Sequence, residues 1–171
     1  MILADLAQWF VQASNYLIAT FGYLGVFFVG FIGSAAIVLP IPSYAVVFLA
    51  ASTLNPFLVG VLAGLGASLG ELVAYTLGKG GRKFILKDKK REKEFTQVES
   101  LFQKYGGFFA IIIIAATPIP DNILGIFCGM IKYPIKKYFA ASLIGKLIFH
   151  LIIAYAGFYS IGFIARMLGI A

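Results

Sequence analysis

Charged side chains are scarce in this sequence of 171 residues. Only 12% of the residues are charged, whereas 61% are hydrophobic, and the mean hydropathy is +0.95. A soluble domain has about a quarter of its residues charged, and a chain this apolar cannot cover its surface with polar groups. The composition therefore excludes a water-soluble globule and predicts an integral membrane protein, with residues 1–171 forming one membrane domain.

Cysteine and histidine are almost absent as well. The one cysteine, Cys128, excludes an intrachain disulfide, and its place in an apolar run predicts a role in core packing. The one histidine, His150, forms no cluster of metal-ligand spacing with the few carboxylates, and no nucleophile stands at a plausible spacing from a base. The sequence therefore predicts no metal, no cofactor and no enzymatic activity.

The charges that are present gather in one stretch. Nine of the fourteen Lys and Arg residues lie between Lys79 and Lys104, among four acids, and three more lysines form a second polar break at 132–137. The positive-inside rule places both breaks on the cytoplasmic side of a plasma or inner membrane. Contact with anionic headgroups explains residues 79–104 better than nucleic-acid binding, because membrane segments flank this stretch and acids interleave it.

A Pro-x-Pro motif occurs twice, each time within an apolar stretch. The two copies are Pro40-Ile41-Pro42 and Pro118-Ile119-Pro120. Prolines one residue apart remove backbone donors and push the preceding residue out of the helical region, so no continuous helix passes through either motif. The arms of the second copy, within Gly106–Ile131, are about half the roughly twenty residues that a span requires. We therefore expect a re-entrant helical hairpin there and, because the motif repeats, a second one within Gly22–Ser52.

One alternative stays open for the first copy, because Gly22–Leu39 is long enough to cross the membrane fully. The segment before it, residues 2–20, carries a polar stripe at helical spacing, as expected of a helix in the interface plane, with a full span as the alternative. The stripe consists of Asp5, Gln8, Gln12 and Asn15. Residues 91–105 form the corresponding amphipathic segment before the second hairpin.

Each hairpin is followed by one apolar segment long enough to span, at Pro56–Gly78 and Ile135–Gly157. The order of interfacial helix, re-entrant hairpin and transmembrane helix thus occurs twice, near 1–79 and 80–171. A single span between the hairpins makes them enter from opposite faces. The sequence therefore predicts an all-α membrane protein with an inverted-topology repeat.

Three ionisable side chains lie inside the apolar segments: Glu71, Asp121 and Lys146. A charge at depth is costly, so each should face the protein interior or a water cavity. Pseudo-twofold symmetry would bring the two spans together and make Glu71 and Lys146 partners. One interpretation is a fixed pair that holds the spans together. The other gives Glu71 a proton-linked role and Lys146 a contact with phosphate. For His150, one turn further, a hydrogen bond between helices or an interfacial position is expected.

Ser43 and Asp121 directly follow the two Pro-x-Pro motifs. Both are preferred N-cap residues, so each is expected to cap the returning half-helix. Half-helix N-termini inside membranes also bind anions and substrates. Asp121 would cancel the helix dipole unless it is protonated or paired, which makes it a candidate proton carrier. Asn122 and Thr117 can supply neutral hydrogen bonds.

The two Pro-x-Pro motifs stand on either side of a third pattern, Gly66-x-x-x-Gly70-Glu71-x-x-x-Tyr75-x-x-Gly78-Lys79. Together they resemble the DedA family, also called the VTT or SNARE-associated Golgi protein domain, over about residues 20–160. The resemblance implies two opposed re-entrant hairpins and activities that move lipids across membranes. These include return of polyprenyl phosphate and flipping or scrambling of phospholipids, with dependence on proton motive force proposed for bacterial members.

The sequence also departs from the family pattern. Ser43 or Tyr44 stands where many members have an acid, and the arginines typical of the second motif are absent. The chain thus looks like a small, divergent member.

The predicted function is a membrane transporter or flippase that moves a phosphate-bearing lipid such as polyprenyl phosphate. Glu71 and Asp121 would handle protons, and the headgroup or pathway contacts would come from Lys146, Ser43, Thr117, Asn122, Tyr75 and His150. The expected partners are this lipid and membrane lipids, and the sequence leaves oligomerisation open. The alternatives are a scramblase or small-solute transporter on the same scaffold, and a structural or assembly membrane protein.

Overall fold

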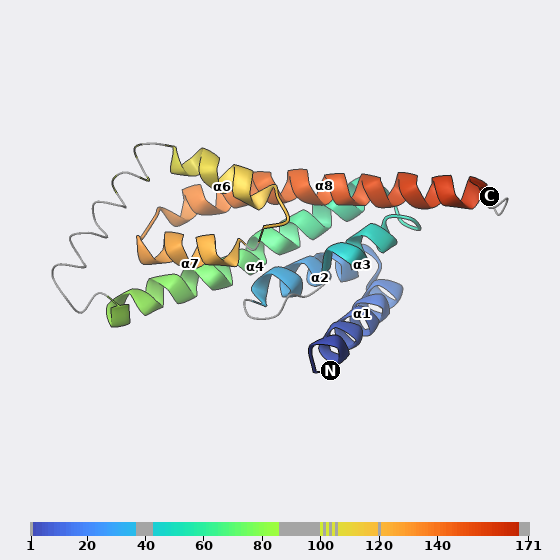
Figure 1. Cartoon of the computed structure of the whole chain (residues 1–171), viewed down its shortest axis with the longest axis horizontal. Helices are drawn as coiled ribbons and strands as arrows, with labels where there is room; N and C mark the ends of the chain where they lie inside the picture. Colours follow the sequence, from blue (N-terminus) through green and yellow to red (C-terminus); the bar gives the residue numbers. More distant parts are fainter. Residues whose placement is uncertain are drawn as a thin grey trace.

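A computed structural model describes residues 2–36, 43–85, 106–119 and 121–167, together with 100, 102 and 104. Every regular element in this part of the chain is an α-helix, as predicted (Figure 1). In chain order, the helices are α1 (Ile2–Phe21), α2 (Tyr23–Ala35), α3 (Ser43–Ala50), α4 (Pro56–Ile85), α6 (Gly107–Ala115), α7 (Asn122–Met130) and α8 (Ile135–Met167).

The two long helices, α4 and α8, are the predicted spans. Among the described residues, 56–82 and 135–160 are the two helical segments long and apolar enough to cross a membrane. Both helices begin where predicted, and Asn55 caps α4 by accepting hydrogen bonds from the backbone N–H groups of Phe57 and Leu58 at 3.0 and 3.2 Å.

The helices that contain the predicted spans Pro56–Gly78 and Ile135–Gly157 are longer than those spans. Both helices continue well past these glycines. A glycine weakens a helix without ending it, and here both glycines serve close packing. A Cβ at Gly78 would meet the carbonyl of Ile126, and one at Gly157 would meet the carbonyl of Phe48.

The helix break at the second Pro-x-Pro motif is confirmed. Helix α6 ends at Ala115 and α7 begins at Asn122, and each has nine residues. At 1.5 Å per residue a nine-residue helix is about 13 Å long, less than half of a hydrocarbon core of about 30 Å. Neither arm can therefore cross alone, and a re-entrant path stays a prediction. Pro118 is exposed in the turn, whereas Pro120 lies outside the described residues.

The first hairpin has arms of thirteen and eight residues in α2 and α3. The helical part of Gly22–Leu39 is thus too short to cross the hydrocarbon as a straight helix. Pro40 and Pro42 lie outside the described residues, as does most of the predicted amphipathic segment 91–105. Within that segment, Phe102 packs its ring against Phe127 and Tyr133.

The helices pack in a reciprocal pattern around α4 and α8. Helix α4 contacts α2 from the first hairpin and α7 from the second, whereas α8 contacts α6 from the second and α3 from the first. The two long helices also contact each other (Figure 1). Each long helix thus packs on the first arm of its own hairpin and the second arm of the other. A twofold repeat requires this pattern, and the inverted orientation of the two halves stays a prediction.

Small residues on α4 let its neighbours approach closely. A Cβ at Gly66 would collide with the backbone of Phe27 on α2, and one at Gly64 would press on Leu147 of α8. From the other side, a Cβ at Gly129 of α7 would collide with the carbonyl of Tyr75. Lipid offers helices no hydrophobic driving force for association. Helix pairs in a membrane are therefore stabilised by close packing contacts of this kind.

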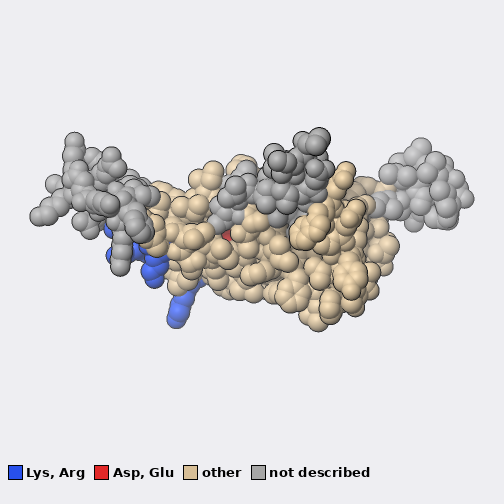
Figure 2. Space-filling model, turned by 90° about the horizontal axis from the view of Figure 1, so that it is seen from below, with Lys and Arg blue, Asp and Glu red and all other residues tan. Residues whose placement is uncertain are grey.

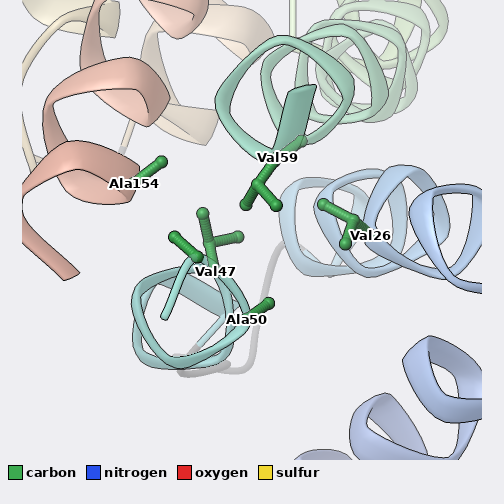
Figure 3. Packing of buried hydrophobic residues seen from close by; sticks show 7 residues of the cluster. Val26, Val47, Ala50, Val59 and Ala154 are labelled. Atoms are coloured by element: carbon green, nitrogen blue, oxygen red, sulfur yellow. The ribbon is translucent and has the colours of Figure 1, made fainter. Parts of the chain in front are cut away.

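Two apolar clusters lie toward opposite ends of the helix pair. One joins α2, α3, α4 and α8 through residues such as Val26, Val47, Val59 and Ala154 (Figure 3). The other contains Tyr75, Ile111, Tyr138 and the fully buried Cys128, whose predicted packing role is confirmed. The polar residues between these clusters on α4 and α8 form the site described below.

Helix α1 has three distinct sides. Val11, Ser14 and Ile18 are buried or half-buried, and Val11 and Ile18 pack on α2 and α3 through Val29 and Val46. The polar stripe points outward at Gln8, Gln12 and Asn15, and the exposed aromatic rings of Trp9 and Tyr16 lie on another side. An outer surface divided between polar and apolar sides suits a helix at the membrane interface. The interfacial position of α1 stays a prediction.

On the face drawn in Figure 2, the described residues are mostly uncharged, and the basic ones lie at one end. Large exposed side chains include Phe109, Ile113 and Ile123 on the hairpin. Arg82, near the end of α4, donates a hydrogen bond to the carbonyl of Met130 at 2.6 Å, just before Lys132. The described start of the first predicted polar break, at Arg82, therefore lies beside the second break, as expected, whereas residues 86–99 lie outside the described residues. That this side is cytoplasmic stays a prediction.

The close contact at Gly78 yields a stability prediction. Gly78→Ala should lower the free energy of unfolding by about 1–3 kcal/mol, because the added methyl group collides with the backbone of α7. Gly80→Ala, on the same helix with nothing within 4 Å, is the matched control, and its greater helix propensity should leave stability equal or slightly higher. Denaturant titration in detergent micelles measures both. Equal stabilities for the two variants would contradict this packing.

Candidate functional site

The candidate site is a buried cluster of three charged side chains from three elements. Lys146 of α8 places its Nζ 2.7 Å from Oε1 of Glu71 on α4 and 2.5 Å from Oδ2 of Asp121, which precedes α7. Glu71 and Lys146 are 1% exposed and Asp121 is 6% exposed. The predicted pairing of Glu71 with Lys146 is confirmed, and Asp121 joins it as a third member.

The carboxylate of Glu71 is held by α8 through more than one residue. Its Oε2 accepts hydrogen bonds from the hydroxyl of Ser142 and from the phenol of Tyr138, the latter at 3.3 Å. Tyr138, Ser142 and Lys146 are spaced four residues apart, so they lie on one face of the helix. Three donors from this face therefore fix Glu71 in place.

Asp121 has a different role from the one predicted. It occupies the N-cap position of α7 but makes no capping hydrogen bond with its side chain, so the prediction of capping was wrong. Its backbone is already close to helical, with φ −89° and ψ −5°, whereas a capping residue is typically extended. The carboxylate instead contacts the ammonium of Lys146, which balances its charge at the helix N-terminus.

The cluster has more acidic groups than basic ones. Two carboxylates surround one ammonium, so with all three ionised it carries one net negative charge. Burial of an unbalanced charge is unfavourable, and one bound proton removes that charge. The site can therefore hold one exchangeable proton while the ammonium of Lys146 keeps its charge.

The other polar residues predicted near the second motif lie in the turn around Asp121. The hydroxyl of Thr117 donates to the carbonyl of Ile114 at 2.7 Å and so satisfies the end of α6. Asn122, next to Asp121, has its side-chain oxygen buried without a hydrogen-bond donor among the described residues. Ser43 is buried at the start of α3, in a position where a Cβ on Gly33 would press on it.

Tyr75 and His150 have structural contacts beside the cluster. The phenol of Tyr75 donates to the carbonyl of Tyr133 at 2.6 Å, and its ring stacks on Tyr138. His150 is buried inside the protein, and its predicted position at the membrane interface stays a prediction. Its Nδ1 lies 2.9 Å from the carbonyl of Lys146, within α8, rather than bonding between helices as predicted. The imidazole ring of His150 lies one helical turn after Lys146, so the carbonyl of Lys146 is within hydrogen-bond reach.

Sequence reasoning missed two hydrogen-bond donors to Glu71, the side chains of Tyr138 and Ser142. Tyr138 was not predicted as a site residue, although its spacing of eight residues from Lys146 places both on the same helix face. Ser142 shares this face as well, four residues from each. The four-residue spacing of Tyr138, Ser142 and Lys146 along α8 is therefore the sequence feature that could have identified these donors.

These features define a helical membrane protein with an ion cluster at the junction of two spans and a hairpin turn. The sequence profile of the VTT domain matches residues 41–159 of this chain. The chain therefore belongs to the VTT-domain family, also called the DedA family.

Relatives of this chain occur in archaea, bacteria and plants. The uncharacterized protein MJ0201 of Methanocaldococcus jannaschii is 33% identical over 138 residues, covering 78% of this chain and 82% of the relative. The uncharacterized membrane protein YbfM of Bacillus subtilis is 32% identical over 145 residues, covering 79% and 88%. The vacuole membrane protein KMS2 of Arabidopsis thaliana is 34% identical over 103 residues, covering 52% of this chain and 25% of the relative. No solved structure matches the chain.

The charge balance of the cluster predicts how substitutions change stability. Lys146→Met should lower the free energy of unfolding by about 3–5 kcal/mol, because it leaves two buried carboxylates without a cation. Adding Asp121→Asn should restore part of this loss, since only Glu71 then remains charged and it keeps Ser142 and Tyr138 as donors. Denaturant titration in micelles, followed by circular dichroism, measures all variants.

The control for Lys146→Met is Lys79→Met, which removes an exposed lysine at the end of α4. It should change stability by less than about 0.5 kcal/mol. If Lys146→Met is no more destabilising than Lys79→Met, the ammonium does not hold the cluster together.

Proposed function

We propose that this protein is a membrane transporter that flips a phosphate-bearing lipid, such as polyprenyl phosphate, across the bilayer with coupling to protons. The observation that supports this most directly is the cluster of Glu71, Asp121 and Lys146, buried where two spanning helices meet a hairpin turn. Charges at such depth are costly and mark transport pathways in other membrane proteins.

The chemistry of the cluster matches a phosphate headgroup and a proton. An ammonium such as that of Lys146 donates charge-assisted hydrogen bonds to phosphate oxygens. The two carboxylates next to it supply the proton-accepting groups. The exposed apolar side chains of the hairpin, such as Phe109 and Ile123, give the lipid tail a surface to follow while the headgroup passes the turn.

The family broadens the support for transport without naming a substrate. VTT-domain proteins are linked to membrane transport in general, and this chain has the helix breaks and buried charges on which transporters build their sites. In this proposal the protein carries out no covalent chemistry and needs no cofactor. Its substrate is the lipid itself.

Transport in proteoliposomes tests the proposal. Wild-type protein should move fluorescent polyprenyl phosphate faster than a phospholipid, and a pH gradient should change the rate. Lys146→Ala should reduce transport of the phosphate lipid roughly 10- to 100-fold, because it removes a charged hydrogen bond worth about 1.5–3 kcal/mol. Glu71→Gln and Asp121→Asn should weaken the response to the gradient.

The matched control is Lys79→Ala, which removes an exposed lysine from α4 and should transport like wild type. Equal movement of phosphate lipid and phospholipid, without any effect of pH, would instead support a scramblase. If all variants fold and none alters movement of any lipid, the cluster serves only to hold the structure together.

A further inference from the structure

We propose that the junction between α7 and α8 is a docking site for the headgroup of an anionic phospholipid. The site consists of Lys132, Lys136 and Lys137, called the junction lysines below. All three are exposed, whereas the buried Lys146 lies about two and a half turns further along α8 than Lys137. The docking site therefore goes beyond the proposed function and does not depend on it.

The backbone at Lys132 has a conformation that favours glycine. Its φ is 53°, the one positive φ of a residue other than glycine in the part of the chain that the structure describes. The N–H of Tyr133 donates to the carbonyl of Cys128 at 2.9 Å, and that of Lys132 donates to the next carbonyl at 3.1 Å. These two bonds form a Schellman motif, in which glycine usually has the positive φ. A lysine kept in this strained position points to a function for its side chain.

Contacts with α4 hold the junction in place. The carbonyl of Tyr133 accepts a hydrogen bond from the phenol of Tyr75 at 2.6 Å. The carbonyl of Met130 accepts one from Arg82, also at 2.6 Å. The other two junction lysines follow in the first turn of α8. The backbone that carries the three ammonium groups is thus fixed before a ligand arrives, which lowers the entropic cost of binding.

The positive charge of the junction lysines has no counterpart among the described residues. None of the three forms an ion pair within the described part of the chain. The sequence has no acid from Asn122 to Lys146, and none in the part of α4 that follows Glu71. Lys136 and Lys137 also stand at the positive end of the α8 dipole, where a cation is unfavourable. An anion is the partner that compensates for these charges.

The apolar surface beside the junction lysines favours a lipid as the source of this anion. Ile135 stands between Lys132 and the other two lysines, and it is 46% exposed. It is also the first residue of an apolar segment long enough to cross a membrane. In a bilayer, the lysines would lie where this span leaves the hydrocarbon, at the level of the phosphate groups. A phospholipid can contact both the ammonium groups and the apolar surface, whereas a soluble anion uses the charges alone.

Thermal unfolding of the full chain in mixed micelles tests the site. Phosphatidylglycerol is added to a neutral maltoside detergent, and the melting temperature is measured as a function of its mole fraction. Phosphatidylcholine with the same acyl chains is the neutral control. Phosphatidylglycerol should raise the melting temperature well beyond phosphatidylcholine, because a ligand that binds only the native state stabilises it. The mole fraction that gives half of the shift measures the apparent affinity.

Substitutions at the junction separate the side chains from the backbone. Lys132→Gly fits the positive φ and should fold as wild type does, but it should need about fivefold more phosphatidylglycerol, the contribution of one lysine at an anionic surface. Lys132→Asn also tolerates a positive φ and should show the same loss. Lys132→Arg keeps the charge and should bind as wild type does. The double variant Lys136→Gln/Lys137→Gln should need roughly 20- to 30-fold more of the lipid.

The matched control is Arg166→Gln, which removes one positive charge near the other end of α8. It should leave the response to phosphatidylglycerol unchanged. An equal loss in Arg166→Gln and Lys132→Gly would show attraction to net charge alone and overturn the site. Equal stabilisation of wild type by the two lipids would overturn it as well.

Two further measurements identify the source of the anion. Glycerol 3-phosphate has the phosphate without acyl chains, and stabilisation equal to that by phosphatidylglycerol would show a site for a soluble phosphate and refute lipid docking. The segment 86–99, which lies outside the described residues, contains the acids Asp88, Glu92, Glu94 and Glu99. A response to phosphatidylglycerol that appears only after these four are replaced by their amides would show that the chain itself occupies the junction lysines, and would also refute the proposal.

Discussion

The ammonium of Lys146 between two carboxylates is the interaction on which the rest of the structure depends. When buried, each of these charges alone would be strongly unfavourable, and each is tolerated because Lys146 lies within hydrogen-bond distance of both carboxylates. The contacts join α4, α8 and the turn before α7, three segments far apart in the sequence. Their geometry therefore fixes how the second hairpin sits against the two long helices.

Close packing of backbones makes this arrangement possible. Gly64 and Gly66 let α8 and α2 approach α4, and Gly78 and Gly129 do the same for α7. Burial of the charges strengthens the attraction between them, while Ser142 and Tyr138 satisfy the second oxygen of Glu71. The odd number of charges then gives the site its chemistry, because neutrality requires one proton or another compensating group.

Local patterns in the sequence predicted much of this. The paired prolines break the apolar stretches whatever their surroundings, because proline lacks a backbone donor in any context. The helix starts at Pro56 and Ile135 and the inward face of Glu71 also followed from local patterns. The helices run further than the apolar segments that were predicted as spans, because Gly78 and Gly157 serve packing and do not end them. The capping role of Asp121 was wrong because a lysine from another helix competes for its carboxylate, and sequence spacing does not reveal that competition.

The sequence by itself determined that this chain resides in a membrane, where its helices break, and which few charges are placed at unfavourable depth. These properties depend on composition and on the chemistry of single residues, so they hold before the chain folds. Only the tertiary structure decided that Asp121 joins Glu71 on the same ammonium and that Tyr138 completes the set of donors. Those contacts depend on the distances between helices. These distances are set jointly by the small residues that pack on several helix faces.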